Sequence, residues 1–238
     1  ASLIININAS PYDIHKSETR KEIVMKKALK LNVPIIYLNM VGGQDELVFD
    51  GGSFVVNDLG EIIYQASSFK EEVFHLDIDL KTNKQNDKSP LIIRPKTIEL
   101  KDVESKASLS KNESIYSALK LGLKDYVRKN KFTKVLIGIS GGIDSALTAA
   151  ICVDALGAEN VIGVAMPSKY NSKDSLDDAI KLSDNLGITL KTIEIEKLVD
   201  DFRETLTNSL NEDLGQITDE NIQSRVRGNI LMLSLIHI

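Results

Sequence analysis

The chain has 238 residues, 42% hydrophobic and 26% charged, and its 29 basic and 34 acidic residues give a net charge of −5. This composition is that of a globular protein with one large or two small domains. The negative charge and the lack of a long basic run disfavour nucleic-acid binding, and no apolar stretch approaches the ~18 residues of a membrane span. The single cysteine, Cys152, excludes a disulfide framework and favours a reducing compartment, the cytoplasm.

The first part of the chain alternates strand-like and helix-like segments. Residues 2–8 are apolar and β-rich and stop before Pro11, which predicts a strand that ends in a loop. Ser17 is predicted to cap an amphipathic helix with Arg20 on its solvent face. The further predictions are a helix over 17–31, a strand over 33–39, a loop over 40–53 with solvated Asp45, Glu46 and Asp50, a hairpin over 54–64 and a strand over 72–78. This order is typical of the closing part of an α/β sandwich.

A polar, lysine-rich stretch separates this part from a second one. It contains Pro90 and Pro95 and predicts a linker over 81–112 between domains over 1–80 and 113–238. Beyond it we predict helices over 113–127, 144–156 and 174–186 and from residue 195, and strands over 134–139, 160–166 and 189–195. Repeated strand–helix alternation with apolar strands predicts a parallel sheet covered on both faces.

A glycine-rich loop between the first strand and helix of the second part carries the strongest chemical signal. It consists of Gly138, Ile139, Ser140, Gly141, Gly142, Ile143, Asp144 and Ser145. The glycines let the backbone approach a ligand closely, and the unpaired N–H groups of the following helix suit phosphate oxygens. Asp144 supplies a hard oxygen ligand for Mg²⁺ beside those phosphates. The loop therefore predicts a nucleotide site, although it matches neither the Gly-Lys-Ser/Thr phosphate loop nor the dinucleotide fingerprint.

Tyr170, Ser172 and Ser175 follow Met166 and Pro167 at the end of a predicted strand. Open α/β sheets bind ligands at this edge, so a role beside the nucleotide is one interpretation. Helix capping and turn formation are the other, and the sequence leaves both open.

Several segments resemble one family. SGGIDS (140–145) resembles the pyrophosphate-binding loop of the ATP pyrophosphatases, and residues 165–179 and 218–232 look like segments of NAD synthetase. Residues 6–16 and 36–53 look like the closing part of the glutaminase domain of glutamine-dependent NAD synthetases. The resemblance implies an α/β chain: the C-terminal part of a nitrilase-like sandwich, then the N-terminal part of a Rossmann-like parallel-sheet ATP pyrophosphatase domain.

The resemblance also implies an activity and site residues. It implies a ligase of NAD biosynthesis that uses ATP and Mg²⁺ to amidate deamido-NAD through an adenylate, with ammonia taken from glutamine. Asn221, Arg225 and Arg227 match deamido-NAD-binding positions, since a guanidinium fork suits phosphate, and Ser10 and Lys16 match glutamine-binding positions. The family's ammonia channelling implies a homo-oligomer.

The match to the family has gaps. The chain does not contain the glutaminase's catalytic cysteine, glutamate and lysine, and Cys152 lies among apolar residues of a predicted helix, where a buried core role is expected. After NILM the family continues to a loop of T-G-N-K-S-E type, whereas this chain ends in LSLIHI. We therefore expect a fragment lacking both ends that does not catalyse the reaction alone.

Three alternatives stay open at this point. Another ATP pyrophosphatase, such as an amidating synthetase or a thiolase-type tRNA enzyme, would share the glycine loop but not the first part of the chain. A non-catalytic nucleotide-binding protein would bind nucleotide without needing Asp144. A chain that is no functional unit would not unfold cooperatively.

Overall fold

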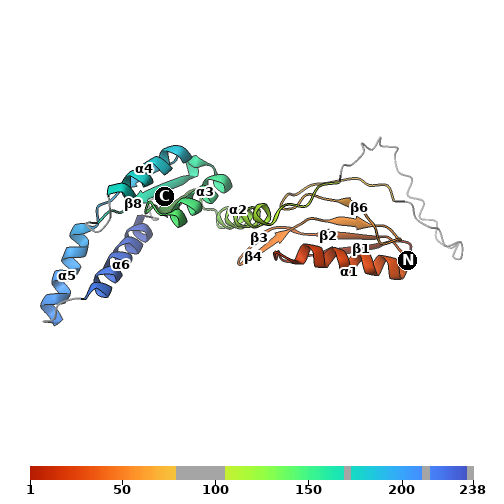
Figure 1. The fold of residues 1–238 in the computed structure, drawn as a ribbon, viewed down its shortest axis with the longest axis horizontal. Coiled ribbons are helices and arrows are strands. Elements are labelled where there is room, and N and C mark those ends of the chain that lie inside the picture. The colour runs from red at the N-terminus through yellow and green to blue at the C-terminus, as the bar shows by residue number, and fades with distance from the viewer. Residues whose placement is uncertain (79–104, 169–172, 211–214, 235–238) are drawn as a thin grey trace. The chain divides into compact units, whose positions relative to one another are not determined.

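The computed structural model describes residues 1–78, 105–168, 173–210 and 215–234, and it divides the chain into two units, Ala1–Asp125 and Tyr126–Ile238 (Figure 1). Most of the linker predicted over 81–112 lies outside the described residues. No helix in the described ranges is both long and apolar enough to cross a membrane.

The first unit contains a mixed four-stranded sheet, a separate hairpin and two helices. Its elements are β1 (Ile4–Asn8), α1 (Lys16–Leu31), β2 (Ile35–Asn39), β3 (Val41–Gln44), β4 (Leu47–Asp50), β5 (Phe54–Val56), β6 (Ile62–Gln65) and α2 (Lys111–Lys129), whose last residues belong to the second unit. The sheet has the order β1-β2-β5-β6, with β1 and β2 parallel and the other pairs antiparallel. The predicted strand over 2–8, the helix over 17–31 and the hairpin over 54–64 are confirmed to within three residues.

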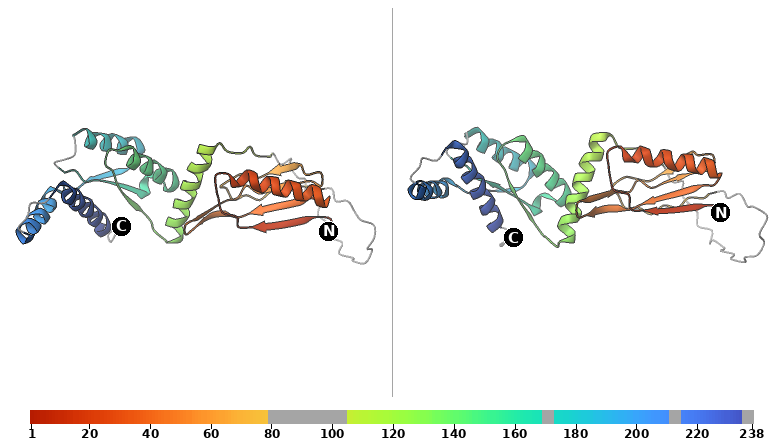
Figure 2. Two further views of the ribbon diagram at one scale, coloured as in Figure 1. Left: turned by 60° about the horizontal axis from the view of Figure 1, so that its bottom comes forward. Right: turned by 90° about the horizontal axis from the view of Figure 1, so that it is seen from below.

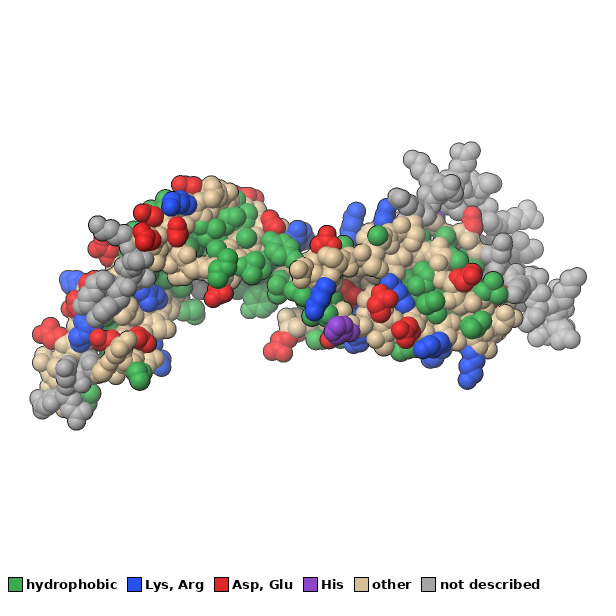
Figure 3. All heavy atoms as spheres, viewed as in Figure 1, with side chains coloured by type: hydrophobic (Ala, Val, Ile, Leu, Met, Phe, Trp, Pro, Cys, Tyr) green, Lys and Arg blue, Asp and Glu red, His purple; other side chains and the backbone are tan. Residues whose placement is uncertain are grey.

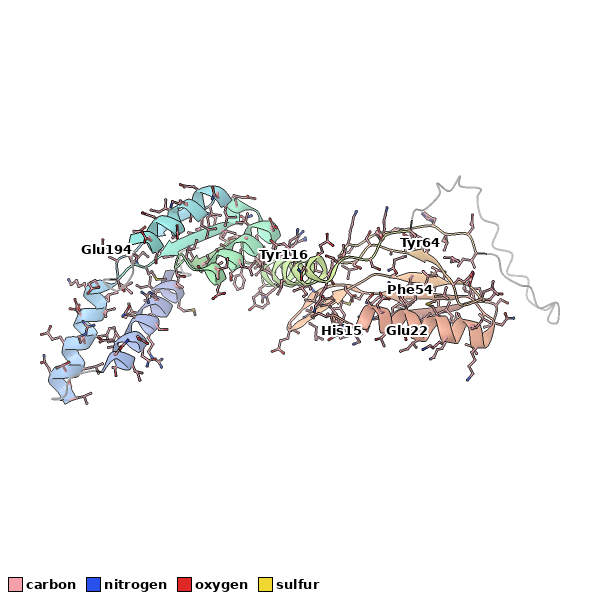
Figure 4. The ribbon with its side chains drawn as sticks, in the orientation of Figure 1. His15, Glu22, Phe54, Tyr64, Tyr116 and Glu194 are labelled. Atoms are coloured by element: carbon pink, nitrogen blue, oxygen red, sulfur yellow. The ribbon has the colours of Figure 1, made fainter. Side chains whose placement is uncertain are left out.

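Both faces of this sheet are covered, at least in part. Helix α1 lies along one face of the sheet (Figures 2 and 4). Its Val24 and Ala28 pack there in a cluster that includes Phe54. On the other face Val55 and Tyr64 meet the apolar side chains of residues 72–78. These side chains alternate because only one side of the segment packs on the sheet, but the segment is not a strand, so the prediction over 72–78 is wrong.

The loop predicted over 40–53 contains the β3–β4 hairpin instead. Glycines are needed here because α2 lies close: a Cβ on Gly43 would lie 3.1 Å from the Cα of Gly122. The Gly43 N–H also donates to Asp125 Oδ2 at 2.7 Å. Gly43 therefore serves close packing of the hairpin on α2.

Two predictions about α1 are also wrong. The helix begins at Lys16 with His15 as the N-cap residue, so Ser17 is not the cap. Arg20 does not lie on the solvent face, because it is 8% exposed and forms an ion pair with Asp50, which is itself buried rather than solvated. Asp45 and Glu46 are exposed, as predicted.

The N-terminus of α2 has a reciprocal cap that was not predicted, although Ser-x-x-Glu is its recognised sequence signal. Ser110 N–H donates to Glu113 Oε2 at 2.9 Å, and Glu113 N–H donates to Ser110 Oγ at 3.4 Å. The hydrogen bonds from the Ser110 side chain, and then from its backbone, hold the pKa of Glu113 below its ordinary value of 4.5.

We predict that the first turn of α2 frays in acid. Because the pKa of Glu113 is lower in the folded than in the unfolded chain, its carboxylate stabilises the folded form at pH values above the unfolded pKa. This stabilisation is lost as the pH falls through the pKa of the folded form. Amide hydrogen exchange at the first turn of α2 should therefore accelerate between pH 6 and pH 3, after correction for intrinsic exchange. In Glu113→Gln this acceleration should disappear, and its persistence would contradict the role of this carboxylate.

The second unit contains a parallel three-stranded sheet with the order β7-β8-β9. Its elements are β7 (Val135–Gly138), α3 (Ile143–Leu156), the 3₁₀ turn η1 (Ala158–Asn160), β8 (Val161–Ala165), α4 (Lys173–Leu186), β9 (Thr189–Thr192), α5 (Glu196–Leu210) and α6 (Gln216–Ser234). Helices α3 and α4 lie on one side of the sheet and α6 on the other (Figures 1 and 2). The predicted parallel sheet with helices on both faces is confirmed.

The core of this unit that matters for the site lies between α5, α6 and the sheet. Val164 of β8, Val199 of α5 and Val226 of α6 are each at most 3% exposed and share one cluster. Packing fixes the register of α6 against the carboxyl ends of β7 and β8. Hydrophobic side chains also gather on the outer surface over α3, where Ile143 and Leu147 are exposed (Figure 3).

Candidate functional site

The glycine-rich loop lies at the carboxyl end of β7 and leads directly into α3. Gly142 is the N-cap residue of that helix, with an extended backbone and no side-chain cap hydrogen bond. The first N–H groups of a helix have no partner within the helix, and the helix dipole places positive charge at the same end. This end of α3 is therefore suited to an anion.

The two serines of the loop hold it in shape. Ser145 Oγ donates to the Gly142 carbonyl at 2.9 Å and accepts from Ser140 N–H at 3.3 Å. Ser140 Oγ lies 3.1 Å from Ser145 Oγ and accepts from Gly142 N–H at 3.3 Å. The turn is thus closed on itself by its own side chains.

Gly141 cannot be replaced without moving the loop. Its φ of +81° lies in the left-handed region, and an added Cβ would overlap the carbonyl oxygen of Ser175 and lie 2.9 Å from the Ser175 Cα. The loop therefore packs directly on the first turn of α4. Ser175 contributes its backbone to this contact, while Tyr170 and Ser172 lie outside the described residues.

A pocket of about 290 Å³ opens beside the loop at the carboxyl ends of β7 and β8. It is lined by Gly138, Ile139, Ser140, Ala165, Met166, Pro167, Ser175, Leu176, Ala179, Arg227 and Leu231. Most of these walls are apolar, with polar groups from the loop and one guanidinium from α6. Concave apolar walls with a few polar groups are typical of small-molecule sites.

Arg227 is the cation of this pocket. Its Nε donates to the Met166 carbonyl at 3.3 Å, and its Nη2 lies 3.5 Å from Oε1 of the buried Gln223. Ser168 Oγ donates to the same Oε1 at 3.0 Å. Partial burial lowers the pKa of Arg227 from its ordinary value.

The other two residues of α6 that are predicted to bind deamido-NAD lie away from Arg227. Asn221 and Arg225 are exposed, and neither lines the pocket. Residues four apart share a helix face. Asn221 and Arg225 therefore lie on one face of α6, and Gln223 and Arg227 lie on another. The structure thus brings Arg227 to the glycine loop but leaves Asn221 and Arg225 away from the pocket.

The fit of the loop to a magnesium ion rests on Asp144. Its carboxylate is exposed in the first turn of α3. In the described part of the chain, no group of three or more His, Cys, Asp or Glu side chains could hold a metal ion. Mg²⁺ commonly binds through one or two carboxylates together with substrate phosphates, so one carboxylate beside a phosphate site fits it.

In the first unit, Ser10 follows β1 and Lys16 opens α1, and both side chains are half-buried. Ser10 Oγ accepts from Arg20 Nε at 3.1 Å, and Ser10 N–H donates to Asn39 Oδ1 at 2.9 Å. Ser10 is therefore tied into the buried polar group around Arg20. No local pattern predicts this contact, because in the sequence Arg20 resembles an ordinary solvent-facing helix residue.

Cys152 lies in α3 and is 5% exposed. Burial raises the pKa of its thiol, which keeps it protonated and unreactive. The predicted core role is therefore confirmed.

A parallel sheet with a glycine loop, a helix N-terminus and a pocket at the carboxyl ends of its strands is the arrangement typical of α/β nucleotide-binding folds. The family model described as NAD synthase matches residues 115–235, and that described as carbon-nitrogen hydrolase matches residues 1–86. The chain belongs to the NAD synthase family, and the predicted resemblance to glutamine-dependent NAD synthetase is confirmed.

Individual relatives agree. The glutamine-dependent NAD(+) synthetase of Thermotoga maritima is 44% identical over 97% of this chain and 43% of its own length, and that of Synechocystis sp. is 41% identical over 97% and 39%. A structure of the Acinetobacter baumannii enzyme in complex with adenosine diphosphate aligns with a TM-score of 0.83, at 40% identity, over 98% of this chain and 41% of that one. The chain spans about two-fifths of the length of these relatives.

Proposed function

We propose that the chain carries the adenine-nucleotide site and part of the glutamine pocket of a glutamine-dependent NAD synthetase. The observation that carries the proposal is the self-closed glycine loop at the end of β7, beside a pocket that Arg227 reaches. The family match of residues 1–86 to carbon-nitrogen hydrolase supports the glutamine side. We keep deamido-NAD as the second substrate, and a cytoplasmic homo-oligomer as the working form.

The proposed reaction has two steps in the second unit. A carboxylate oxygen of deamido-NAD attacks the α-phosphorus of ATP, and the bond to the departing pyrophosphate breaks. Ammonia then attacks the activated carbonyl carbon, its nitrogen releases a proton to water, and AMP leaves with the electron pair of the broken carbon–oxygen bond. In this scheme Asp144 would hold Mg²⁺, and the ion would supply positive charge that neutralises the phosphates.

The residues of the chain have distinct tasks in this scheme. The N–H groups at the start of α3 bind the phosphates that leave as pyrophosphate. Arg227 stabilises negative charge from the opposite wall of the pocket, and the apolar walls around Met166 and Leu231 exclude water from the nucleotide. Asn221 and Arg225 stay assigned to the dinucleotide, and Ser10 and Lys16 to glutamine.

The proposal predicts that Asp144→Ala weakens MgATP binding at least tenfold. The reason is that the variant loses the carboxylate that would hold Mg²⁺ beside the loop. Isothermal titration of the 238-residue chain with MgATP, and with ATP plus EDTA, measures this. The magnesium-dependent gain in affinity should disappear in Asp144→Ala.

Asp154→Ala is the matched control, because Asp154 is an exposed carboxylate near the other end of the same helix. It should bind MgATP as the unmodified chain does. Unchanged magnesium-dependent binding by Asp144→Ala would contradict the assignment and favour a nucleotide-binding protein of another kind.

A further inference from the structure

Gln223 is a buried polar side chain of α6 to which the proposed function assigns no task. It is only 8% exposed, and a polar group at such depth needs hydrogen-bond partners. Its Oε1 accepts from Ser168 Oγ at 3.0 Å and from Arg227 Nη2 at 3.5 Å. One amide oxygen therefore joins the segment that follows β8 to the cation of the pocket.

The contact with Ser168 fixes the amide of Gln223 in place. Gln223 and Arg227 are four residues apart on one helix face, and pairs at this spacing on a helix surface are weak. Here Gln223 is buried, and Ser168, 55 residues away in the sequence, holds the same oxygen. Because both donors use Oε1, the acceptor end of the amide must face Arg227.

The guanidinium of Arg227 is held along one edge. Its Nε donates to the Met166 carbonyl at 3.3 Å and its Nη2 donates to Gln223 Oε1, and these two nitrogens form one edge of the planar group. Two bonds along one edge fix the orientation of the plane as well as its position. Both acceptors are uncharged, so these bonds orient Arg227 without neutralising its charge.

We propose that Gln223 is a positioning residue that orients Arg227 towards the phosphates of the bound nucleotide. This inference rests on the proposed function of the pocket, in which Arg227 meets negative charge across from the glycine loop. A guanidinium binds phosphate well because its fork is held in one geometry. Loss of the Gln223 oxygen loosens that fork, while the apolar walls around Met166 and Leu231 stay as they are.

Gln223→Met tests this role, because methionine keeps the length of the side chain but offers Arg227 no oxygen acceptor. Isothermal titration of the 238-residue chain should show MgATP binding weakened about fivefold or more, which corresponds to one hydrogen bond of a charged group. Ligand-observed NMR should show adenosine, which has no phosphate and depends on the apolar walls, binding within about twofold of the unmodified chain.

Gln216→Met is the matched control. Gln216 lies at the start of the same helix, is exposed, and donates through Nε2 to Glu220 Oε1 at 3.0 Å. The same change of side chain at this surface position should leave the binding of MgATP and of adenosine unchanged.

The decisive comparison repeats the substitution in Arg227→Met. If Gln223 acts through Arg227, Gln223→Met causes no further loss in this background, and the double variant binds MgATP as Arg227→Met alone does. An amide that only supports the fold would instead weaken binding by the same factor in both backgrounds. That result, or an equal loss of adenosine binding, would overturn the inference and leave the assignment of the pocket standing.

The remaining outcomes are also decisive. If Arg227→Met binds MgATP as the unmodified chain does, or if the unmodified chain does not bind MgATP, the proposed role of Arg227 fails and the inference fails with it. If Gln223→Met does not unfold cooperatively, Gln223→Asn replaces it, because asparagine keeps the amide but draws its oxygen back from Arg227. The same loss, absent in Arg227→Met, is expected, and unchanged MgATP binding by Gln223→Asn would overturn the inference.

Discussion

Gly141→Ala is expected to abolish measurable MgATP binding by the glycine loop. The new Cβ would overlap the backbone of Ser175, and backbone, unlike a flexible side chain, cannot give way locally. The φ of +81° adds strain of about 1 kcal/mol or more for a residue other than glycine. The loop must therefore move off α4, which displaces the N–H groups that we propose bind the phosphates. Isothermal titration should show a loss of at least a hundredfold.

Gly228→Ala is the control for this substitution. Gly228 lies in α6, and a Cβ there would meet nothing within 4 Å. Alanine is favoured over glycine in a helix by about 1 kcal/mol, so this variant should be slightly more stable and should bind MgATP unchanged. Binding by Gly141→Ala within threefold of the control would show that the phosphates bind elsewhere.

Arg20→Met is expected to destabilise the first unit by about 3–5 kcal/mol, because it leaves Asp50 charged and buried without its partner. A domain is stable by only about 5–15 kcal/mol in total, so this loss is large. Amide hydrogen exchange in β1 and β2 measures it for this unit alone. Exchange in β7 and β8 should remain unchanged.

Two further variants locate the cause of that loss. Lys26→Met removes an exposed ion pair and should change stability by less than about 1 kcal/mol. Arg20→Met combined with Asp50→Leu removes both charges, and should recover part of the loss because no unpaired charge stays buried. If the double variant loses as much stability as Arg20→Met and Asp50→Leu lose in sum, the unpaired buried charge is not the cause of the destabilisation.

Periodicity and glycine signals predicted the second unit well. Its strands are short, apolar and followed by amphipathic helices, and each of these signals is local in sequence. The glycine loop was found for the same reason, since strand, glycines and helix are contiguous. The pocket was not, because Met166, Arg227 and Leu231 come together only through the packing of α6 on the sheet.

The predictions that are wrong in the first unit also concern residues whose partners lie far away in the sequence. Arg20 lies in a helix rich in lysine, and nothing nearby in the sequence shows that Asp50, thirty residues later, neutralises it. The β3–β4 hairpin was read as a loop because its glycines serve contact with α2, which begins sixty-one residues after the hairpin ends. Local pattern cannot reveal contacts that depend on distant partners.

The self-closed hydrogen bonding of the glycine loop bears on how a nucleotide would bind. Ser140 and Ser145 hold the turn through bonds that involve no ligand, so the N–H groups at the start of α3 are arranged before a phosphate arrives. The entropic cost of ordering this loop falls on folding rather than on association. Nucleotide capture should then resemble docking onto a rigid surface, with affinity set mainly by how fast the ligand leaves.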